Sequence, residues 1–569
     1  MIKRVLSIGL SAVLWGFTLF RLEGQELLPL NWHLQDLGKD GLPGIRLEKA
    51  YEELNKTKRT PKTVVVAILD SGVDFNHEDL KPVMWVNSGE IPENGKDDDQ
   101  NGYVDDIHGW NFIGGAQENV RYDTYEATRL YAAMRYKFEN ADVSKLSGEQ
   151  KKEYKTYLEL KDQVESRRES ARKNLDQIQQ TQKVIQGALA ALAEVMGTQE
   201  LNEENLEKVT ETESEQLLMG LAIAKQVIQG EVKFPSVKDF REVIMMDIEE
   251  GIQYYSKELN YSFNPDYDSR SIVGDQYQNS SERVYGNNDA MGPEPSHGTH
   301  VAGIVGAMRE NGIGMDGIAD QVRIMSVRCV PDGDERDKDV ANAIRYAVDN
   351  GASVINMSFG KGYSPQKSVV DEAVRYAEEH DVLLVHAAGN SATNNDKVKN
   401  FPNRSFEKKK FLSCNKTQNW IEVGASGYET GKELIAPFSN YGKKDVDLFA
   451  PGMEIYSTKP GHGYVKEQGT SMASPVVAGV AALLRSYFPE LTAKQVKNII
   501  LKSVYKPEYK VMNPETKKEA LMKQWSSTGG LLDAHGAVQL ALKTKGKKKS
   551  SGDPNVGSDK SNSKNPKRS

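Results

Sequence analysis

The sequence Val64-Val65-Val66-Ala67-Ile68-Leu69 is a continuous apolar run made mostly of β-branched residues, and Asp70 follows it directly. Such a run is typical of a strand that is buried on both faces, as in a parallel sheet. Similar short runs recur along the chain, with helical patterns between several of them. The apolar runs are 322–330, 353–357, 382–386 and 421–423, and the helical patterns are 338–350 and 368–380. Because strands alternate with helices, the sequence predicts an α/β domain with a mostly parallel sheet.

Residues 116–286 interrupt this alternation. The stretch is rich in Glu, Lys, Gln and Ala, and its helical parts contain almost no Pro or Gly. Apolar residues recur every seven positions, at Tyr157, Val164, Ala171, Ile178, Ile185 and Leu192. This period predicts a long, coiled-coil-like helix that packs on a second helix over 203–229, and Ser236 is expected to cap a third helix. We interpret the stretch as a self-packed α-helical insert, whose outer faces are either solvated or bind a partner protein or a second copy.

The two ends of the chain differ in composition from the α/β part. Lys3 and Arg4 precede an apolar run too short to span a bilayer, so residues 1–24 are interpreted as a signal peptide, with an uncleaved anchor as the alternative. Residues 25–63 form an N-terminal arm, and the α/β part consists of 64–115 and 287–545. Residues 546–569 are rich in Lys, Ser and Asn, which predicts a disordered basic tail. We therefore expect an exported protein with no stable membrane span after removal of the leader.

The composition excludes several classes of protein. The 569 residues are 38% hydrophobic and 27% charged, which is the balance of a globular protein rather than of a disordered or polytopic membrane protein. The net charge of −8 gives no reason to expect binding to nucleic acid. Two cysteines, Cys329 and Cys414, are too few for a disulfide scaffold or a four-thiolate zinc site. They are expected as two buried thiols or as a single bridge.

Three segments contain residues suited to nucleophilic catalysis. Asp70 follows the first predicted strand, at the edge where the functional crevice of an open α/β sheet lies. His297-Gly298-Thr299-His300 begins a helix of small residues, and Ser471 begins a strongly apolar helix whose free N–H groups and dipole stabilise an anion. Each segment alone has an ordinary explanation as a turn, a packed helix or a helix cap. A zinc site at His297 and His300 is an alternative, but the Glu of a His-Glu-x-x-His motif is absent.

Taken together and in this order, the three segments resemble the subtilisin-like serine protease (subtilase) family. The matching stretches are 64–77, 297–306, 356–360, 387–390, 450–452 and 469–482, so the resemblance covers the α/β part and none of the insert. It implies the three-layer fold of subtilisin. It also implies that Ser471 is the nucleophile, that His297 accepts its proton, and that Asp70 orients and stabilises the imidazole.

Other site residues follow from the same resemblance. Asn390 matches the side-chain donor of the family's oxyanion hole, which the Ser471 N–H completes. Ser358, Phe359 and Gly360 match the segment that pairs with the substrate backbone and lines the first specificity pocket. Strand pairing recognises the main chain more than the side chains, so the resemblance implies broad specificity for protein or peptide substrates. No organic cofactor is expected.

An acidic loop follows the first predicted strand. Asp97, Asp99 and Asn101 alternate as in the first half of a calcium-binding loop, although His108 stands where that loop has its bidentate Glu. Calcium loops in this region are common in subtilases, so the resemblance favours a structural Ca²⁺ with four ligands. These are Asp97, Asp99, Asn101 and Asp105. A solvated acidic turn is the alternative.

The expected function is that of an exported serine endopeptidase, which is secreted, periplasmic or attached to the cell envelope. The arm at 25–63 is too short to be the folding prodomain that many secreted subtilases carry. Because Asp70 and His297 must meet, we expect the ends of the insert near the cleft, where the insert would limit access to Ser471. The alternatives are a binding protein that displays the insert on a subtilase scaffold, and a zinc hydrolase.

Overall fold

A computed structural model of the chain describes residues 28–209, 213–228, 233–408 and 415–547. The described residues form two compact units, one made of 122–268 and the other of 28–121 together with 269–547. The predicted signal peptide, Cys414 and all but the first two residues of the predicted tail lie outside the described residues. Within the described part of the chain, every helix is too short or too polar to cross a membrane.

The larger unit is built on a seven-stranded sheet of order β2-β3-β1-β4-β5-β6-β7, in which all neighbouring strands are parallel. In that order the strands are Gly109–Asn111, Val322–Arg328, Val64–Asp70, Ala352–Met357, Leu383–Ala387, Trp420–Ser426 and Leu448–Pro451. The α/β fold predicted from the apolar runs is therefore confirmed. The edge strands β2 and β7 were not predicted, because each is too short to form a recognisable apolar run.

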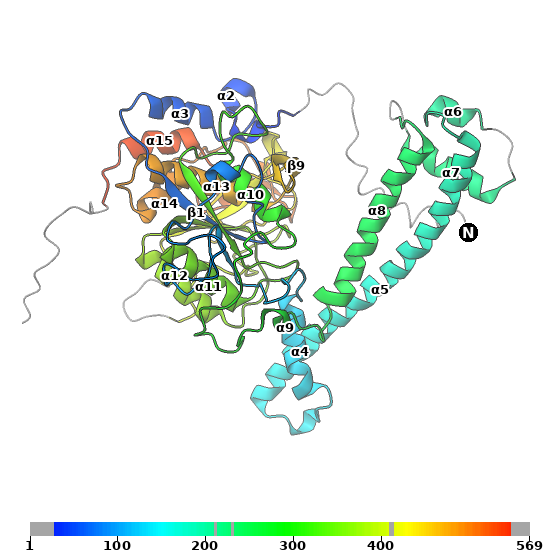
Figure 1. Cartoon of the computed structure of the whole chain (residues 1–569), viewed down its shortest axis with the longest axis horizontal. Coiled ribbons are helices and arrows are strands. Elements are labelled where there is room, and N and C mark those ends of the chain that lie inside the picture. The colour runs from blue at the N-terminus through cyan, green and yellow to red at the C-terminus, as the bar shows by residue number, and fades with distance from the viewer. Residues whose placement is uncertain (1–27, 210–212, 229–232, 409–414, 548–569) are drawn as a thin grey trace, which may run out of the picture. The chain divides into compact units, whose positions relative to one another are not determined.

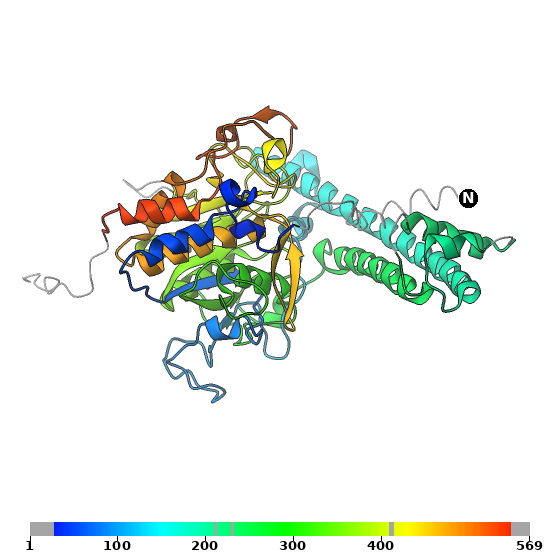
Figure 2. The ribbon, with the colours of Figure 1, turned by 90° about the horizontal axis from the view of Figure 1, so that it is seen from above.

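Strand β1 is buried between two layers of helices. Val66 and Ile68 belong to one hydrophobic core, and Ala67 and Leu69 belong to the other, as alternation along a strand requires. Different helices cover the two faces of the sheet (Figures 1 and 2). The first face carries α10 (Ser296–Gly306), α13 (Thr470–Tyr487), α14 (Ala493–Lys502) and α15 (Ala534–Leu542), and the second carries α11 (Asp337–Asp349) and α12 (Lys367–Glu379). This is the three-layer arrangement that the sequence predicts.

The N-terminal arm is part of the larger unit. Its main helix, α3, spans Leu47–Asn55 and packs on α15. Trp32 and Leu47 are fully buried and join the same hydrophobic core as α13. Arg46, at the start of α3, pairs with Asp533 at the start of α15. The arm therefore contributes to the core of the sheet unit.

The smaller unit is helical. Its longest helix, α5, spans Gly148–Met196 and begins with a capping box between Ser147 and Gln150. It packs on both α7 (Glu215–Val227) and α8 (Val237–Lys257). Most of the residues of the predicted heptad are buried, namely Tyr157, Val164, Ala171, Ile185 and Leu192. The buried stripe agrees with the predicted amphipathic pattern, while the coiled-coil interpretation stays a prediction.

Two helices of this unit differ from the sequence-based expectation. The pattern over 203–229 is divided into α6 (Glu203–Glu207) and α7, with residues 210–212 outside the described part of the chain.

Helix α8 begins after Ser236, whose side chain accepts a hydrogen bond from the Asp239 N–H at 3.3 Å, as predicted. It continues into a π-helical turn over Glu258–Ser262. A shorter helix, α4, spans Glu126–Phe138 and also packs on α5.

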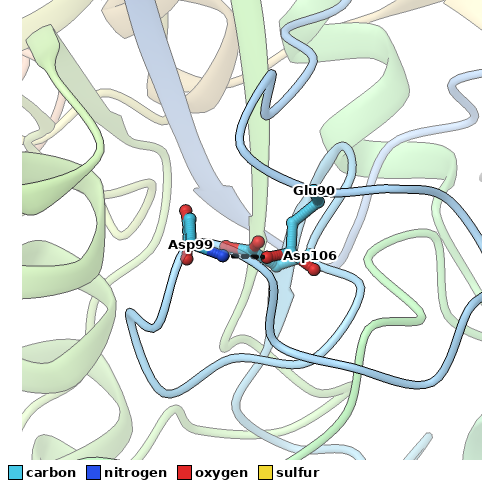
Figure 3. A group of neighbouring side chains, drawn as sticks. All are labelled: Glu90, Asp99 and Asp106. Atoms are coloured by element: carbon cyan, nitrogen blue, oxygen red, sulfur yellow. Dashed lines mark hydrogen bonds between the residues drawn. The ribbon is translucent and has the colours of Figure 1, made fainter.

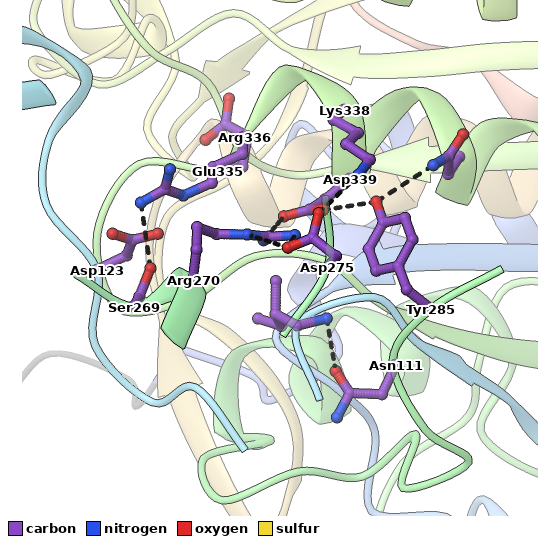
Figure 4. A network of polar contacts seen from close by, with 12 residues as sticks. Asn111, Asp123, Ser269, Arg270, Asp275, Tyr285, Glu335, Arg336, Lys338 and Asp339 are labelled. Atoms are coloured by element: carbon purple, nitrogen blue, oxygen red, sulfur yellow. Dashed lines mark hydrogen bonds and ion pairs between the residues drawn. The ribbon is translucent and has the colours of Figure 1, made fainter. Parts of the chain in front are cut away.

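The segment that follows the helical unit joins the sheet unit through a buried polar network (Figure 4). The Arg270 guanidinium donates to Asp339 Oδ2 at 2.7 Å and lies 2.6 Å from Asp275 Oδ1. Lys338 Nζ, whose side chain is 1% exposed, lies 2.6 Å from Asp275 Oδ2. Buried charges of this kind need partners, so the network ties the segment to the start of α11. The compact helical unit is therefore shorter at this end than the stretch 116–286 delimited by composition.

Candidate active site

Asp70 and His297 meet at the carboxyl edge of the sheet. Asp70 is the last residue of β1 and is 1% exposed. His297 is the second residue of α10, and its Nδ1 lies 2.7 Å from Asp70 Oδ1. The side chain of His297 is 38% exposed, so the ring is accessible from the surface. With the Nδ1 proton directed at Asp70, Nε2 carries the lone pair of the neutral imidazole and can accept a proton.

Gly298 allows α10 to approach the end of β1. A Cβ atom at this position would lie 2.1 Å from the Gly72 carbonyl oxygen and 3.1 Å from Asp70 Cβ. Any side chain would therefore push the helix away from the strand and lengthen the contact between His297 and Asp70. The glycine of the His-Gly-Thr-His sequence thus has a structural role at this site.

The surrounding charges raise the pKa of His297. Burial lowers this pKa, but the charge and hydrogen bond of Asp70, followed by the charge of Glu467, more than offset that effect. Glu467 ends β9 (Gly463–Glu467), which pairs with β8 (Ile455–Lys459). The pKa of Glu467 is also raised, because burial disfavours its charged form more than the charge of His297 favours it. Sequence reasoning missed Glu467, because its place near His297 depends on the pairing of β8 with β9.

Ser471 lies in the first turn of α13, which begins within one residue of its predicted start. Ser471 Oγ donates to the Ser358 carbonyl at 3.1 Å, and Ser358 Oγ donates to the Ser471 carbonyl at 2.8 Å. Pro475, four residues later, has no N–H to bond the Ser471 carbonyl, which leaves that oxygen for Ser358. The Ser471 N–H belongs to the first turn, where backbone donors have no helical acceptor. Ser471 is thus held against the segment that follows β4.

Asn390 follows β5 and contacts the start of α13. Its Oδ1 accepts hydrogen bonds from the Thr470 N–H at 2.8 Å and from Thr470 Oγ1 at 2.9 Å. Because Thr470 occupies the oxygen of the amide, Nδ2 of Asn390 is the atom available to donate to a ligand. Thr470 precedes Ser471 and was not identified from the sequence, since its role depends on the strand beside it.

The segments that carry these residues also match known proteins. The sequence model that describes the subtilase family matches residues 61–536 of this chain. The chain belongs to the subtilase family. Over 225 residues this subtilase is 40% identical to the thermophilic serine proteinase of Bacillus sp. (strain AK1), covering 39% of this chain and 49% of that one. It is 38% identical to subtilisin DY of Bacillus licheniformis over 205 residues, covering 36% of this chain and 68% of that one.

A third relative is considerably longer than this subtilase. The cell wall-associated protease of Bacillus subtilis (strain 168) is 36% identical over 218 residues, which is 38% of this chain and 22% of that one. The subtilase thus matches about half of the strain AK1 proteinase, at 49%, and less than a quarter of the cell wall-associated protease, at 22%.

The second histidine of the subtilase motif, His300, packs inside the sheet unit. It is fully buried, and its Nε2 lies 3.0 Å from the Ile455 carbonyl and 3.2 Å from the Val465 carbonyl. Burial lowers the pKa of His300 to about 4, so the ring is neutral at pH 7. These contacts hold His300 inside the sheet unit, and a zinc site shared with His297 would require His300 to give them up.

The acidic loop of this subtilase brings three carboxylates together. Figure 3 shows Glu90, Asp99 and Asp106, of which one oxygen each lies within 4.8 Å of the others. Asp99 is the one carboxylate that this group shares with the ligand set expected from the sequence. Asp106 is fully buried, and burial raises its pKa to about 6, with the charge of Asp99 adding to the effect. A group of close carboxylates with one buried member has the oxygen ligands that Ca²⁺ prefers.

Asp97 and Asp105, which the sequence also suggested as ligands, form turns in this structure. The Asp97 carboxylate accepts the Asn101 N–H at 3.0 Å and the Gly102 N–H at 2.8 Å. The Asp105 carboxylate accepts the Gly95 N–H at 2.8 Å. The fourth expected ligand, Asn101, lies at the edge of the group, with Nδ2 3.1 Å from Asp99 Oδ2. The alternation of acidic residues is visible in the sequence, but the turns decide which side chains converge.

Proposed function

We propose that this subtilase is a serine endopeptidase that hydrolyses protein or peptide substrates through an acyl-enzyme intermediate. The observation that carries the proposal is the 2.7 Å contact between His297 Nδ1 and Asp70 Oδ1. The contact lies at the carboxyl edge of the sheet. There Ser471 contacts Ser358 in the segment after β4, and Asn390 in the segment after β5 contacts Thr470. The names of two relatives, a serine proteinase and a subtilisin, support the same activity.

In the proposed reaction Ser471 attacks the scissile carbonyl carbon. Its hydroxyl turns from the Ser358 carbonyl towards His297 Nε2, which accepts the proton as the new C–O bond forms. Asp70 holds the tautomer and stabilises the imidazolium, which then gives the proton to the leaving amine as the C–N bond breaks. Water attacks the acyl-enzyme in the second half of the cycle. His297 accepts the proton of the water and returns it to Ser471 as the ester bond breaks.

The negative charge on the tetrahedral intermediate is stabilised by two donors. They are Asn390 Nδ2 and the Ser471 N–H, and the dipole of α13 adds to their effect. Thr470 keeps Asn390 in the donor orientation through its contacts of 2.8 Å and 2.9 Å to Oδ1. We expect the Asn390→Ala variant to lose about 10²–10³-fold in kcat, as subtilisin does when it lacks its side-chain donor. Ser358, Phe359 and Gly360 pair with the substrate backbone as an added strand.

Labelling with a fluorophosphonate tests this function directly. The purified full chain is expected to form a covalent adduct at Ser471, and the Ser471→Ala variant to form none. Ser391→Ala, which changes an exposed serine near the site, is the matched control and should label like the unaltered chain. Cleavage of a peptide library should be abolished by Ser471→Ala. A chain that forms no adduct and cleaves no peptide would contradict the proposal and favour the binding-protein alternative.

A structural Ca²⁺ is part of the proposal. Glu90, Asp99 and Asp106 would hold the ion, because one carboxylate oxygen of each lies within 4.8 Å of the others and Ca²⁺ prefers oxygen ligands. The raised pKa of Asp106 supports this, since a buried carboxylate gains most from a nearby cation. Asp97 and Asp105 would act indirectly, by forming the turns that bring the three carboxylates together.

Export is the proposed location, with secretion, the periplasm and the cell envelope as its possible destinations. The support is the charged and apolar pattern of residues 1–24 in the sequence. A relative whose name places it at the cell wall of Bacillus subtilis is consistent with this proposal. Detection of the mature chain outside the cytoplasm, with its N-terminus sequenced, tests it.

The helical unit is proposed to limit which substrates reach Ser471. Its ends lie close together, since Tyr267 OH donates to the Tyr122 carbonyl at 3.2 Å and the rings of Tyr122 and Tyr261 stack at 4.4 Å. Residues 122–268 can therefore be replaced by a short Gly-Ser linker that keeps the contacts of Arg270 with Asp275 and Asp339. We expect faster cleavage of folded proteins and unchanged cleavage of short peptides. Equal rates on folded proteins with and without the unit would contradict this role.

A further inference from the structure

Arg328, the last residue of β3, lies beside the proposed triad. It pairs with Asp70 in the register of the parallel strands β3 and β1. Val66 and Ile324 form an earlier pair of the same two strands, and both belong to the core beneath α10 and α13. Because every second side chain of a strand lies on the same face, Asp70 and Arg328 lie on that face as well. Arg328 is 1% exposed, and burial lowers its pKa to about 10, so it is a buried cation at pH 7.

The guanidinium of Arg328 donates to uncharged oxygens of three separate segments. Its Nε donates to the Ser71 carbonyl at 2.9 Å, directly after Asp70. Its Nη1 donates to Asn111 Oδ1 at 3.1 Å at the end of β2, and its Nη2 donates to the Val120 carbonyl. The donors of a guanidinium have a rigid, planar geometry. Arg328 therefore fixes the positions of these three segments relative to one another.

Ser71 connects this guanidinium to the Asp70 carboxylate. The Ser71 N–H donates to Asp70 Oδ1 at 2.8 Å, and the same oxygen lies 2.7 Å from His297 Nδ1. The Ser71 carbonyl is the group that Arg328 Nε binds. Because the two hydrogen bonds hold opposite ends of one residue, the orientation of Ser71 sets the position of Asp70 Oδ1. A displacement at Arg328 would pass through Ser71 to the contact between Asp70 and His297.

The chain that precedes α10 packs closely on this arrangement. A Cβ atom on Gly292 would lie 2.2 Å from Arg328 Nε, and one on Gly72 would lie 1.9 Å from the Met291 carbonyl oxygen. Residues 291 and 292 thus contact both the guanidinium and the turn that follows Asp70. In a close-packed interior a displacement is transmitted to the neighbouring groups. The guanidinium could therefore not shift without moving that turn.

We propose that Arg328 is a positioning residue of the triad, which acts through Ser71 to set the contact between Asp70 and His297. This inference rests on the proposed endopeptidase function. Arg328 is buried beside Asp70, so we assign it no contact with the substrate. Its replacement should therefore slow the chemical step and leave substrate binding unchanged.

The variant Arg328→Lys tests the proposal in the full chain, because lysine keeps the charge but lacks the rigid fork of donors. We expect kcat for a short peptide to fall roughly 10–100-fold, as a misplacement of about 1 Å in an active site can produce, with KM unchanged. The matched control is Arg485→Lys. Arg485 is 5% exposed and donates to the Asp381 carbonyl at 3.0 Å, near the end of α13 that is remote from Ser471. This control should keep the original kcat.

The pH profile of Arg328→Lys provides a readout that a purely structural role would not change. Burial lowers the pKa of His297, whereas Asp70, followed by Glu467, raises it above its ordinary value. A longer contact with Asp70 weakens the larger of the two raising effects. The acid limb of kcat/KM should therefore move to lower pH in Arg328→Lys and stay in place in Arg485→Lys.

A double-mutant cycle shows whether Arg328 acts through Asp70. In the Asp70→Asn background Arg328→Lys should cause little further loss of kcat, because the contact that Arg328 supports is already ineffective. An equal loss in both backgrounds would overturn the proposal. So would an equal loss in Arg485→Lys, or a folded Arg328→Lys variant with the original kcat and acid limb.

Failure of this inference is distinguishable from failure of the proposed function. An unaltered chain that cleaves no peptide and forms no fluorophosphonate adduct contradicts the endopeptidase function itself. If Arg328→Lys does not fold, Asn111→Ser removes the acceptor of Nη1 and leaves the cation in place. It should show a smaller fall in kcat, the same unchanged KM and a shift of the acid limb in the same direction. A folded Asn111→Ser variant with none of these changes would then overturn the role of Arg328.

Discussion

His297 Nδ1 lies 2.7 Å from Asp70 Oδ1 although 227 positions separate the two residues in the chain. The whole helical unit is inserted between them, and the sheet unit nevertheless brings them together. The contact depends on the close packing of α10 on β1, which Gly298 permits. The proposed chemistry therefore rests on the packing of the sheet unit.

Replacing Asp70 by Asn should reduce kcat by about 10⁴-fold, because the amide no longer stabilises the imidazolium and favours the wrong imidazole tautomer. Substrate binding should change little, since Asp70 is buried beneath His297. Steady-state kinetics with a short peptide will separate kcat from KM, and circular dichroism will show whether the variant is folded. A folded variant that keeps more than a tenth of the original kcat would disprove the assigned role.

Replacing Glu467 by Gln should move the acid limb of the pH profile to lower pH. The proposed base must be neutral to accept a proton, so activity rises as the pH increases through the pKa of His297. The charge of Glu467 helps to raise that pKa, and its removal should lower it. The profile of kcat/KM between pH 4 and 9 is the measurement. Glu454→Gln, which removes the carboxylate that lies 3.8 Å from Lys466 on the same β-ribbon, is the control and should leave the limb in place.

Calcium should stabilise the chain, and more so above about pH 6. Because burial raises the pKa of Asp106 to about 6, its ionised form is unfavourable in the folded state without a cation. The loss of folding stability appears as the pH rises from the pKa of Asp106 in the unfolded chain towards about 6. A bound cation should remove this loss. A Ca²⁺ concentration of 100 times Kd should raise the free energy of unfolding by about 2.7 kcal/mol. Differential scanning fluorimetry detects this change as a rise in Tm.

Two variants distinguish this calcium effect from a general effect of the salt. Asp106→Asn should abolish most of the rise in Tm, whereas Glu93→Gln, an exposed carboxylate in the same loop, should preserve it. The proposed site would have to be abandoned if Ca²⁺ raised Tm equally in the unaltered chain and in Asp106→Asn. A rise that did not depend on pH would argue against Asp106 in particular.

Replacing Arg270 by Ala should destabilise the sheet unit by about 3–5 kcal/mol, because the buried carboxylate of Asp339 would lose its guanidinium partner and Asp275 would keep only Lys338. The urea midpoint, followed by tryptophan fluorescence, is the measurement. Arg345→Ala removes an arginine whose partner Glu372 is 73% exposed at 4.0 Å, and it should cost less than about 1 kcal/mol. Similar midpoints for the two variants would show that the network contributes little.

The sequence alone was sufficient to predict the five central strands of the sheet, and the resemblance to subtilases implied the residues of the proposed triad. Val66 and Ile68 lie in a run whose composition requires burial on both faces, and Ser471 precedes a helix that is apolar all round. These properties are local, because they depend on neighbouring residues and on the periods of the strand and the helix. The motif around His297 is local in the same sense.

Glu467, Thr470 and the carboxylate pair of Glu90 and Asp106 could not be identified in that way. Each acts through a neighbour that is distant in sequence or that a turn brings close: Glu467 acts on His297, and Thr470 on the segment that follows β5. The side chains of such residues have no periodic pattern, since their partners are set by the pairing of β8 with β9 and by the loops between strands. The amino-acid order thus determined which segments are strands and helices, while the packing of those segments decided which charged and amide side chains lie next to one another.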